Sequence, residues 1–336
     1  MLSRLLPDRF ILWLLATVAL ALLLPVSGDA AAVVDMLTLA SIFALFFLHG
    51  VRLPRQALLS GVTDWRLHLA ILALTFAVFP LFGLALSRAL PGLVAPELWT
   101  GILFLCALPS TVQSSIAYTS IARGNVAGAV AAAAYSNLVG VFLTPLLAWA
   151  MLQAQSASIS WGGIARIFAL LFLPFVLGHA MRPLLRAFVE ARPRLTTVVD
   201  KGTILLAVYG AFSAATHAGV WRRLPPLDLA LLAVLLMLIL AAIMSAALLV
   251  GRLGGFAAPS RAAILFCGSV KSLVAGAPMA RLLFPAAAAG VVILPVMVFH
   301  TLQLIVSAWI ASAWARRIEA DAQPACPGGG RDPVGR

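Results

Sequence analysis

The feature that most constrains the fold is a series of ten apolar stretches separated by short polar segments. Each stretch is long enough for a helix to cross about 30 Å of hydrocarbon, at about 1.5 Å of rise per residue. The stretches lie near residues 10–26, 33–50, 67–89, 98–121, 125–152, 161–182, 197–217, 227–250, 260–282 and 286–315. Only 10% of the residues are charged, against roughly 25% in soluble domains. We therefore predict an all-α polytopic membrane protein with ten transmembrane helices.

The lysine and arginine residues predict how these helices are oriented. With the N-terminus in the cytoplasm, 17 basic residues fall in cytoplasmic segments, five fall outside, and the twenty-third is Lys271. This bias predicts an inner-membrane protein with both termini in the cytoplasm. Arg4 and Arg9 before an apolar run are also compatible with a signal peptide, but the matching charge bias of the later stretches favours a first transmembrane helix.

The remaining charge pattern bears on partners and on the tail. The net charge of +12 is scattered through short loops and forms no basic domain, so we expect the lipid bilayer as partner and no nucleic acid. Residues 319–336 are rich in Pro and Gly and are predicted to form a disordered cytoplasmic tail.

Lys271 lies at the centre of the ninth apolar stretch. An ammonium at membrane depth costs about 3 kcal/mol on insertion scales, so it needs compensation. Its neighbours are small or polar, which is typical of a helix broken inside a protein-lined cavity: Gly268, Ser269, Ser272, Gly276 and Pro278. A second polar break, at 108–115, interrupts the fourth stretch. Two interrupted stretches in corresponding positions of two halves indicate the binding site of a transporter.

The two breaks are also related in sequence. Residues 113–123 align with residues 271–281, with four of eleven positions identical, and the copies end on opposite sides of the membrane. This predicts two inverted five-helix repeats, residues 1–155 and 156–318, whose broken helices 4 and 9 cross at the membrane midplane. Gln113 and Lys271 should approach each other at that crossing.

Acidic residues and catalytic motifs are informative by their placement. All eleven Asp and Glu residues fall in loops, tails or helix ends, so the sequence offers little for a sodium site or proton relay based on a buried carboxylate. The sequence contains no nucleotide-binding loop, paired carboxylates, metal-binding spacing or Ser-His-Asp arrangement. We therefore expect neither an enzyme nor a bound cofactor or metal.

Four motifs carry a resemblance to a known family. They are Leu-Pro-Ser-Thr-Val-Gln-Ser-Ser at 108–115, Ala-Arg-Gly-Asn at 122–125, Phe-Cys-Gly-Ser-Val-Lys-Ser-Leu at 266–273 and Phe-Leu-His-Gly at 47–50. Over about residues 10–315 the chain resembles the SBF-like branch of the bile acid:sodium symporter superfamily. The resemblance implies a panel domain of helices 1, 2, 6 and 7 and a core domain of helices 3–5 and 8–10.

The chain departs from the sodium-coupled members of that superfamily at the residues that bind sodium. Ser114 and Ser115 match their crossover pair in position, but the hydroxyl residues expected on helix 5 fall on Ala129 and Ala133. The Glu and Gln expected on helix 9 are replaced by apolar residues, and Lys271 occupies an Asn position. Because sodium prefers several hard oxygen ligands, most of the sodium site that the resemblance implies is missing.

Nine residues are candidates for lining a substrate or ion site: Gln113, Ser114, Ser115, Asn137, Ser269, Lys271, Ser272, His300 and Gln303. The residues of the breaks either face the site or satisfy backbone groups freed by a proline kink. His300 is either a protonatable partner of the crossing or a histidine bonded to a carbonyl, and Gln303 shares its helix face. Lys271 is expected to donate to helix-end carbonyls and to Ser114, Ser115 or Ser269, unless it snorkels to an interface.

We interpret the chain as a secondary transporter that moves a small organic anion or amphipathic solute by alternating access. In that hypothesis Lys271 replaces a sodium ion, so sodium-independent transport or coupling to protons is favoured over two-sodium symport. The alternative is a membrane regulatory or scaffold protein without transport activity. An intramembrane enzyme is disfavoured because buried acids are missing.

Overall fold

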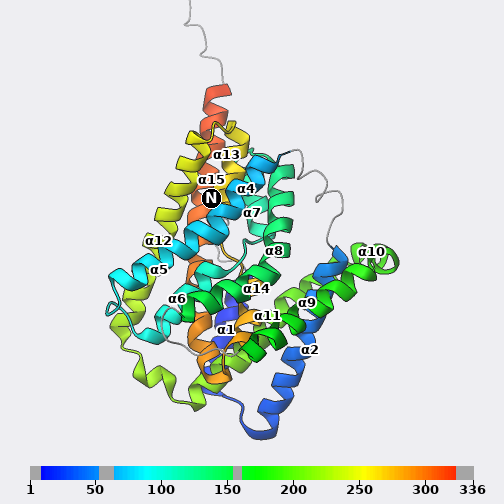
Figure 1. Ribbon diagram of the computed structural model, residues 1–336, viewed down its shortest axis with the longest axis vertical. Coiled ribbons are helices and arrows are strands. Elements are labelled where there is room, and N and C mark those ends of the chain that lie inside the picture. The colour runs from blue at the N-terminus through cyan, green and yellow to red at the C-terminus, as the bar shows by residue number, and fades with distance from the viewer. Residues whose placement is uncertain (1–8, 53–63, 154–160, 323–336) are drawn as a thin grey trace, which may run out of the picture.

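The computed structural model describes residues 9–52, 64–153 and 161–322, and each regular element in these ranges is a helix (Figure 1). In the N-terminal half these are α1 (Arg9–Leu23), α2 (Gly28–Arg52), α4 (Trp65–Ala73), the π-helical η2 (Leu74–Val78), α5 (Phe79–Ala89), α6 (Pro96–Ala107), α7 (Gln113–Ile121) and α8 (Val126–Gln153). In the C-terminal half they are α9 (Trp161–Ala180), α10 (Arg182–Glu190), α11 (Pro193–His217), the 3-10 helix η3 (Val220–Arg223), α12 (Pro226–Leu253), α13 (Ala258–Gly268), α14 (Leu273–Leu283) and α15 (Ala286–Ala322).

Seven of the described helical segments are long and apolar enough to cross a membrane, so the chain is a multi-pass membrane protein. They are Gly28–Arg52, Trp65–Ala89, Val126–Leu152, Pro193–His217, Pro226–Leu253, Ala258–Leu283 and Ala286–Arg317. The number is eight if α9 and α10, which meet at a bend of 88°, form one span. Two of the ten predicted stretches give shorter helices: α1 ends two residues before Pro25 and α6 ends two residues before Pro109.

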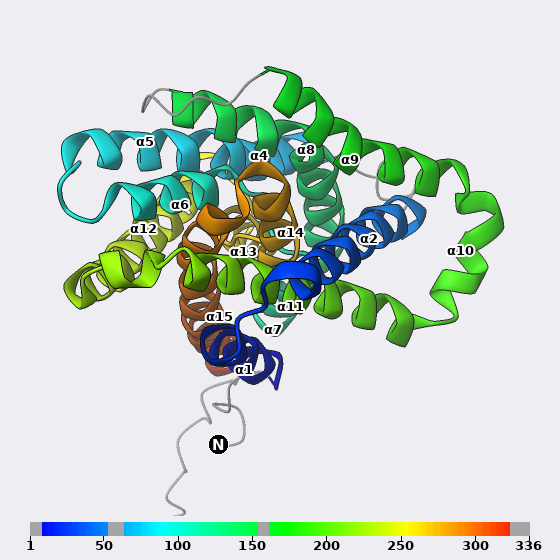
Figure 2. The ribbon, with the colours of Figure 1, turned by 90° about the horizontal axis from the view of Figure 1, so that it is seen from below.

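The helices pack as two groups (Figure 2). The first, which we call the four-helix group, consists of α1, α2, α9 and α11. The second, the crossing group, consists of α4 to α8 and α12 to α15, and it contains both predicted breaks. The groups meet where α11 packs on α14 and α15 and where α8 packs on α9.

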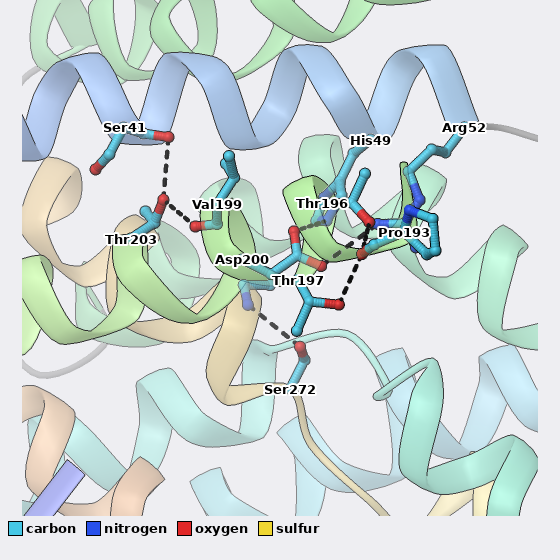
Figure 3. Close-up of polar contacts among 11 residues, drawn as sticks. Ser41, His49, Arg52, Pro193, Thr196, Thr197, Val199, Asp200, Thr203 and Ser272 are labelled. Atoms are coloured by element: carbon cyan, nitrogen blue, oxygen red, sulfur yellow. Dashed lines mark hydrogen bonds and ion pairs between the residues drawn. The ribbon is translucent and has the colours of Figure 1, made fainter. Parts of the chain in front are cut away.

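Glycines and an acidic residue hold α2 in the four-helix group. A Cβ at Gly50 would lie 2.0 Å from the carbonyl oxygen of Phe175, and a Cβ at Gly178 would lie 2.0 Å from that of Phe47. Only glycines permit this backbone approach between α2 and α9. On its other face α2 meets α11, where Asp200 lies 3.4 Å from Arg52 and 3.6 Å from His49 (Figure 3).

Two predictions concern residues at the edges of the described ranges. The predicted tail begins inside α15, which continues to Ala322, and residues 323–336 lie outside the described ranges, as does Cys326. Cys106 and Cys267 are buried free thiols in the crossing group, as expected for small apolar fillers.

Candidate functional site: a lysine at the crossing of two helix breaks

Both predicted breaks interrupt a helix, and they touch each other inside the crossing group. The first break separates α6 from α7 at residues 108–112, and the second separates α13 from α14 at residues 269–272. The amide of Ser272 donates to the carbonyl of Pro109 at 2.9 Å. The unwound backbone of one break is therefore bonded directly to the unwound backbone of the other.

Lys271 is buried at this contact, with 1% of its surface exposed. Its ammonium Nζ donates to three backbone carbonyls: Thr75 at 2.8 Å, Cys106 at 2.8 Å and Leu108 at 2.7 Å. The ring centroid of Phe79 lies 4.1 Å from Nζ and contributes a cation–π contact. All three N–H bonds of the ammonium are satisfied inside the protein, so the side chain does not snorkel to an interface.

The carbonyls around Lys271 are available because the local backbone leaves them without amide partners. Cys106 and Leu108 lie at the end of α6, where the last carbonyls of a helix have no donor and carry partial negative charge. Thr75 belongs to the π-helical turn η2, in which a carbonyl accepts from the amide five residues later. For Thr75 that residue is Pro80, which has no N–H. The ammonium thus caps the C-terminal end of α6 and also donates to the carbonyl that Pro80 leaves without a partner in η2.

The other carbonyls of the first break are bonded as well. Each carbonyl from residue 106 to residue 110 accepts a hydrogen bond. Lys271 Nζ donates to the carbonyls of Cys106 and Leu108, and the Ser272 amide donates to that of Pro109. The Thr144 hydroxyl donates to the Ala107 carbonyl at 2.9 Å, and Asn137 Nδ2 donates to the Ser110 carbonyl at 3.1 Å. Buried backbone groups that lack a partner would be costly at this depth. The break is therefore held by polar side chains of α8 and by the second break.

The side chain of Gln303 in α15 supplies hydrogen bonds to the Lys271 peptide, which lies in the second break and has no partners within a helix. Its Oε1 accepts from the Lys271 amide at 2.7 Å, and its Nε2 donates to the Lys271 carbonyl at 2.8 Å. Nε2 also lies 3.0 Å from Nδ1 of His300. Gln303 is fully buried, and its amide group both accepts from and donates to the backbone of Lys271. It fixes the backbone from which the ammonium projects.

The predicted serines lie at the breaks but do not bind Lys271. Ser115 donates to the Thr111 carbonyl at 2.7 Å, Ser114 pairs with the Thr111 hydroxyl, and Ser269 donates to the Leu265 carbonyl. The expectation that Lys271 donates to these serines is therefore wrong, because helix-end carbonyls occupy its three donors. The expectation that it donates to carbonyls holds.

The remaining candidates divide between the interior of the crossing and its surface. Ser272 caps α14 by accepting from the Ala275 amide, and Asn137 bonds the first break. Gln113 begins α7 with an exposed side chain, and no hydrogen bond joins it to Lys271 in the described part of the chain. Thr75 and Phe79 belong to the site but were not among the candidates, although Pro80 inside an apolar stretch was a usable signal.

The described residues around Lys271 do not form a site for a metal ion. No group of three or more His, Cys, Asp and Glu side chains that could hold a metal occurs there. The carbonyl oxygens that a sodium ion would use as ligands at the crossing are already bonded to the Lys271 ammonium. With Lys271 in place, these oxygens do not fit a sodium ion.

Comparisons with known proteins agree over nearly the whole chain. A family model described as "SBF-like CPA transporter family (DUF4137)" matches residues 8–316. The chain is 50% identical over 315 residues to a Pseudomonas aeruginosa protein named "Uncharacterized protein PA2026", covering 94% of this chain and 95% of that protein. It is 41% identical over 312 residues to the Escherichia coli protein "Putative symporter YfeH", covering 93% and 94%. It is 24% identical over 313 residues to "Sodium/bile acid cotransporter 7" of Danio rerio, covering 91% and 93%.

Proposed function

Since the chain belongs to the SBF-like CPA transporter family, we propose that it is a secondary active transporter that moves a small organic anion or amphipathic solute by alternating access. Family and relatives indicate a transporter of the bile acid:sodium symporter type. The solute class comes from the name of the zebrafish relative, because bile acids are amphipathic organic anions. No feature of the described residues supports catalysis.

The architecture that we propose is ten membrane segments in two inverted repeats, residues 1–155 and 156–318. The two broken helices and their mutual contact support it, and so does a match between α2 and α11. Each of these helices carries Val-Val-Asp at its sixth to eighth residues and Thr three residues later, at 33–38 and 198–203. The four-helix group would then be the panel and the crossing group the core.

We further propose that both termini lie in the cytoplasm of the cell, with the protein in the inner membrane. Basic residues near three helix C-termini support this orientation: Arg52 is the last residue of α2, Arg252 is the next-to-last residue of α12, and Arg316 lies in the last two turns of α15. A reporter fused to the C-terminus tests it. A fusion that is active only in the periplasm would refute the orientation.

The observation that carries the coupling proposal is the Lys271 ammonium, which lies on three carbonyl oxygens at 2.7–2.8 Å. A cation is needed where the negative end of α6 meets unwound backbone. Because the Lys271 ammonium occupies these carbonyl oxygens, we propose that the protein transports without sodium. A proton gradient is then the driving force to be tested.

Uptake into proteoliposomes tests this function. Labelled organic anions are offered to the wild type and to the Lys271→Asn variant, in sodium and in sodium-free buffer, with and without a pH gradient. We expect the wild type to accumulate a solute in sodium-free buffer and the variant to lose activity or to acquire a sodium requirement. Strict sodium dependence of the wild type would refute the role of Lys271. If no solute accumulates under any condition, the chain is a regulatory or scaffold protein instead.

A further inference from the structure

Two aspartates occupy equivalent positions in the two halves of the chain. Asp35 is the eighth residue of α2, and Asp200 is the eighth residue of α11. In both helices a threonine three residues later donates to the carbonyl of the preceding valine at 2.7 Å: Thr38 to Val34 and Thr203 to Val199. Equal positions, flanking residues and local hydrogen bonds make these two aspartates counterparts in an inverted repeat.

Two arginines are related in the same way. Arg281 lies in the last turn of α14, and Arg123 lies two residues after the end of α7. They are the final, identical residues of the two segments that align in sequence, 113–123 and 271–281. Inverted symmetry therefore relates an Asp35–Arg281 pair to an Asp200–Arg123 pair.

Only the first of these two pairs is formed in the structure. Asp35 forms an ion pair with Arg281, whose side chain is 7% exposed. Asp200 binds Arg52 and His49 at the end of α2 instead (Figure 3). A Cβ at Gly210 of α11 would lie 3.6 Å from Nη2 of Arg281, so α11 lies against the Asp35–Arg281 pair.

The helix beside the formed pair, α14, is also more buried than its counterpart α7. Helix α14 is covered by α11, and Met279 near its end is 1% exposed. The aligned residue of α7 is Ile121, which is 46% exposed. Among its described contacts, α2 packs on α9, α10 and α11, and it does not cover α7 as α11 covers α14. One side of the crossing is therefore closed while its counterpart is open.

We propose that Asp35–Arg281 and Asp200–Arg123 are two alternative gate pairs that form in turn as the transporter changes state. In the state of this structure the Asp35–Arg281 pair closes the side at which α14 ends. In the opposite state that pair separates, α2 covers α7, and Asp200 leaves Arg52 and His49 to bind Arg123. The inference rests on the alternating access proposed above and names the charges that select each state.

The side near Asp35 is already hollow enough for a reagent to reach this gate. A cavity of about 510 Å³ is lined by residues of α2, α11 and α15, among them Asp35, Gly210 and His217. Asp35 keeps half of its side-chain surface exposed, whereas Arg281 lies behind it. Separation of the pair would therefore extend this cavity toward α14.

Thiol labelling of the purified protein in nanodiscs tests the proposal without a known solute. Single Ile121→Cys and Met279→Cys variants are made in a Cys326→Ser parent, whose buried Cys106 and Cys267 set the background rate. Both faces are open to a hydrophilic maleimide. We expect fast labelling at position 121 and slow labelling at position 279, as their exposure indicates.

Removal of one gate charge should change the two rates in opposite directions. With Asp35→Asn we expect labelling to become slower at position 121 and faster at 279, so that the ratio of the two rates changes about fivefold, the shift that one partly exposed ion pair can produce. Arg123→Gln should leave labelling fast at 121 and slow at 279, because Asp200 is paired with Arg52 and His49 in this state and the Asp35–Arg281 pair is unchanged. Charge reversal, Asp35→Arg with Arg281→Asp, should restore the rates of the parent.

Glu97→Gln is the matched control, since Glu97 is an exposed acid at the start of α6 with no described ion pair. The proposal is overturned if Asp35→Asn leaves both rates within twofold of the parent, or if both rise together as in local unfolding. Opposite changes without any solute uptake would support the gates and contradict the transport function. Uptake without opposite changes would do the reverse.

Discussion

Replacement of Lys271 by methionine should destabilise the protein strongly, because it removes the donor of three buried carbonyls and keeps the length of the side chain. A buried acceptor left without a partner costs about 1–3 kcal/mol, so Thr75, Cys106 and Leu108 together lose about 3–9 kcal/mol. Part of this loss is offset, because the variant no longer buries an ammonium, whose desolvation costs several kcal/mol. We therefore expect a net loss of about 3 kcal/mol in the free energy of unfolding.

Thermal unfolding of the purified protein, followed by size-exclusion chromatography after heating, measures this effect. At about 2–4 °C per kcal/mol, the midpoint should fall by about 6–12 °C. The matched control is Lys201→Met, which changes the other lysine of the chain. The Lys201 ammonium lies 5.2 Å from the ring centroid of Phe10 and binds no described carbonyl, so its loss should cost less than about 1 kcal/mol. Equal midpoints for the two variants would refute the view that Lys271 holds the crossing together.

Three further predictions test the supports of the crossing and of the four-helix group. Gln303→Leu should lower the free energy of unfolding by about 2 kcal/mol, because two hydrogen bonds to the Lys271 peptide are lost; the same thermal assay measures it. Lys271→Ala should melt several degrees higher in sodium than in choline, unlike the wild type, because the freed carbonyls are hard ligands; equal midpoints would contradict this. Gly178→Ala should abolish monodisperse protein on size exclusion, since its Cβ would meet the Phe47 carbonyl at 2.0 Å, whereas Gly202→Ala, with open space around its Cβ, should behave as wild type.

The sequence was sufficient to predict the helical class and the two breaks, because apolar length and helix-breaking residues are local properties. Pro109 ends α6 and the Gly-Ser-Val-Lys segment ends α13, as expected. The partners of Lys271 could not be predicted in the same way. Its acceptors are backbone oxygens from three places in the chain, and a backbone oxygen has no residue-specific signature. Serines, which do have one, were therefore chosen wrongly as its partners.

The sequence predicted where charged residues lie along the chain better than it predicted which residues they pair with. The expectation that acids fall in loops, tails or helix ends is wrong for Asp35 and Asp200, which lie about two turns inside their helices and bind arginines far away in sequence. The Val-Val-Asp segments shared by α2 and α11 are a second sequence signal of the repeat. His300 and Gln303 were correctly paired, since three residues of helix bring side chains together.

The close crossing of α2 and α9 has a consequence for biosynthesis. Gly50 and Gly178 bring the two helices together backbone to backbone, yet the whole of α4 to α8 is synthesised between them. When α2 enters the bilayer, its closest neighbour does not yet exist, and its glycine surface faces lipid until the ribosome has made α9. Lipid tails cannot fill a surface shaped for a helix backbone, and van der Waals packing is the main attraction between helices in a membrane. The first half of the chain therefore completes its own packing only after the second half has been inserted.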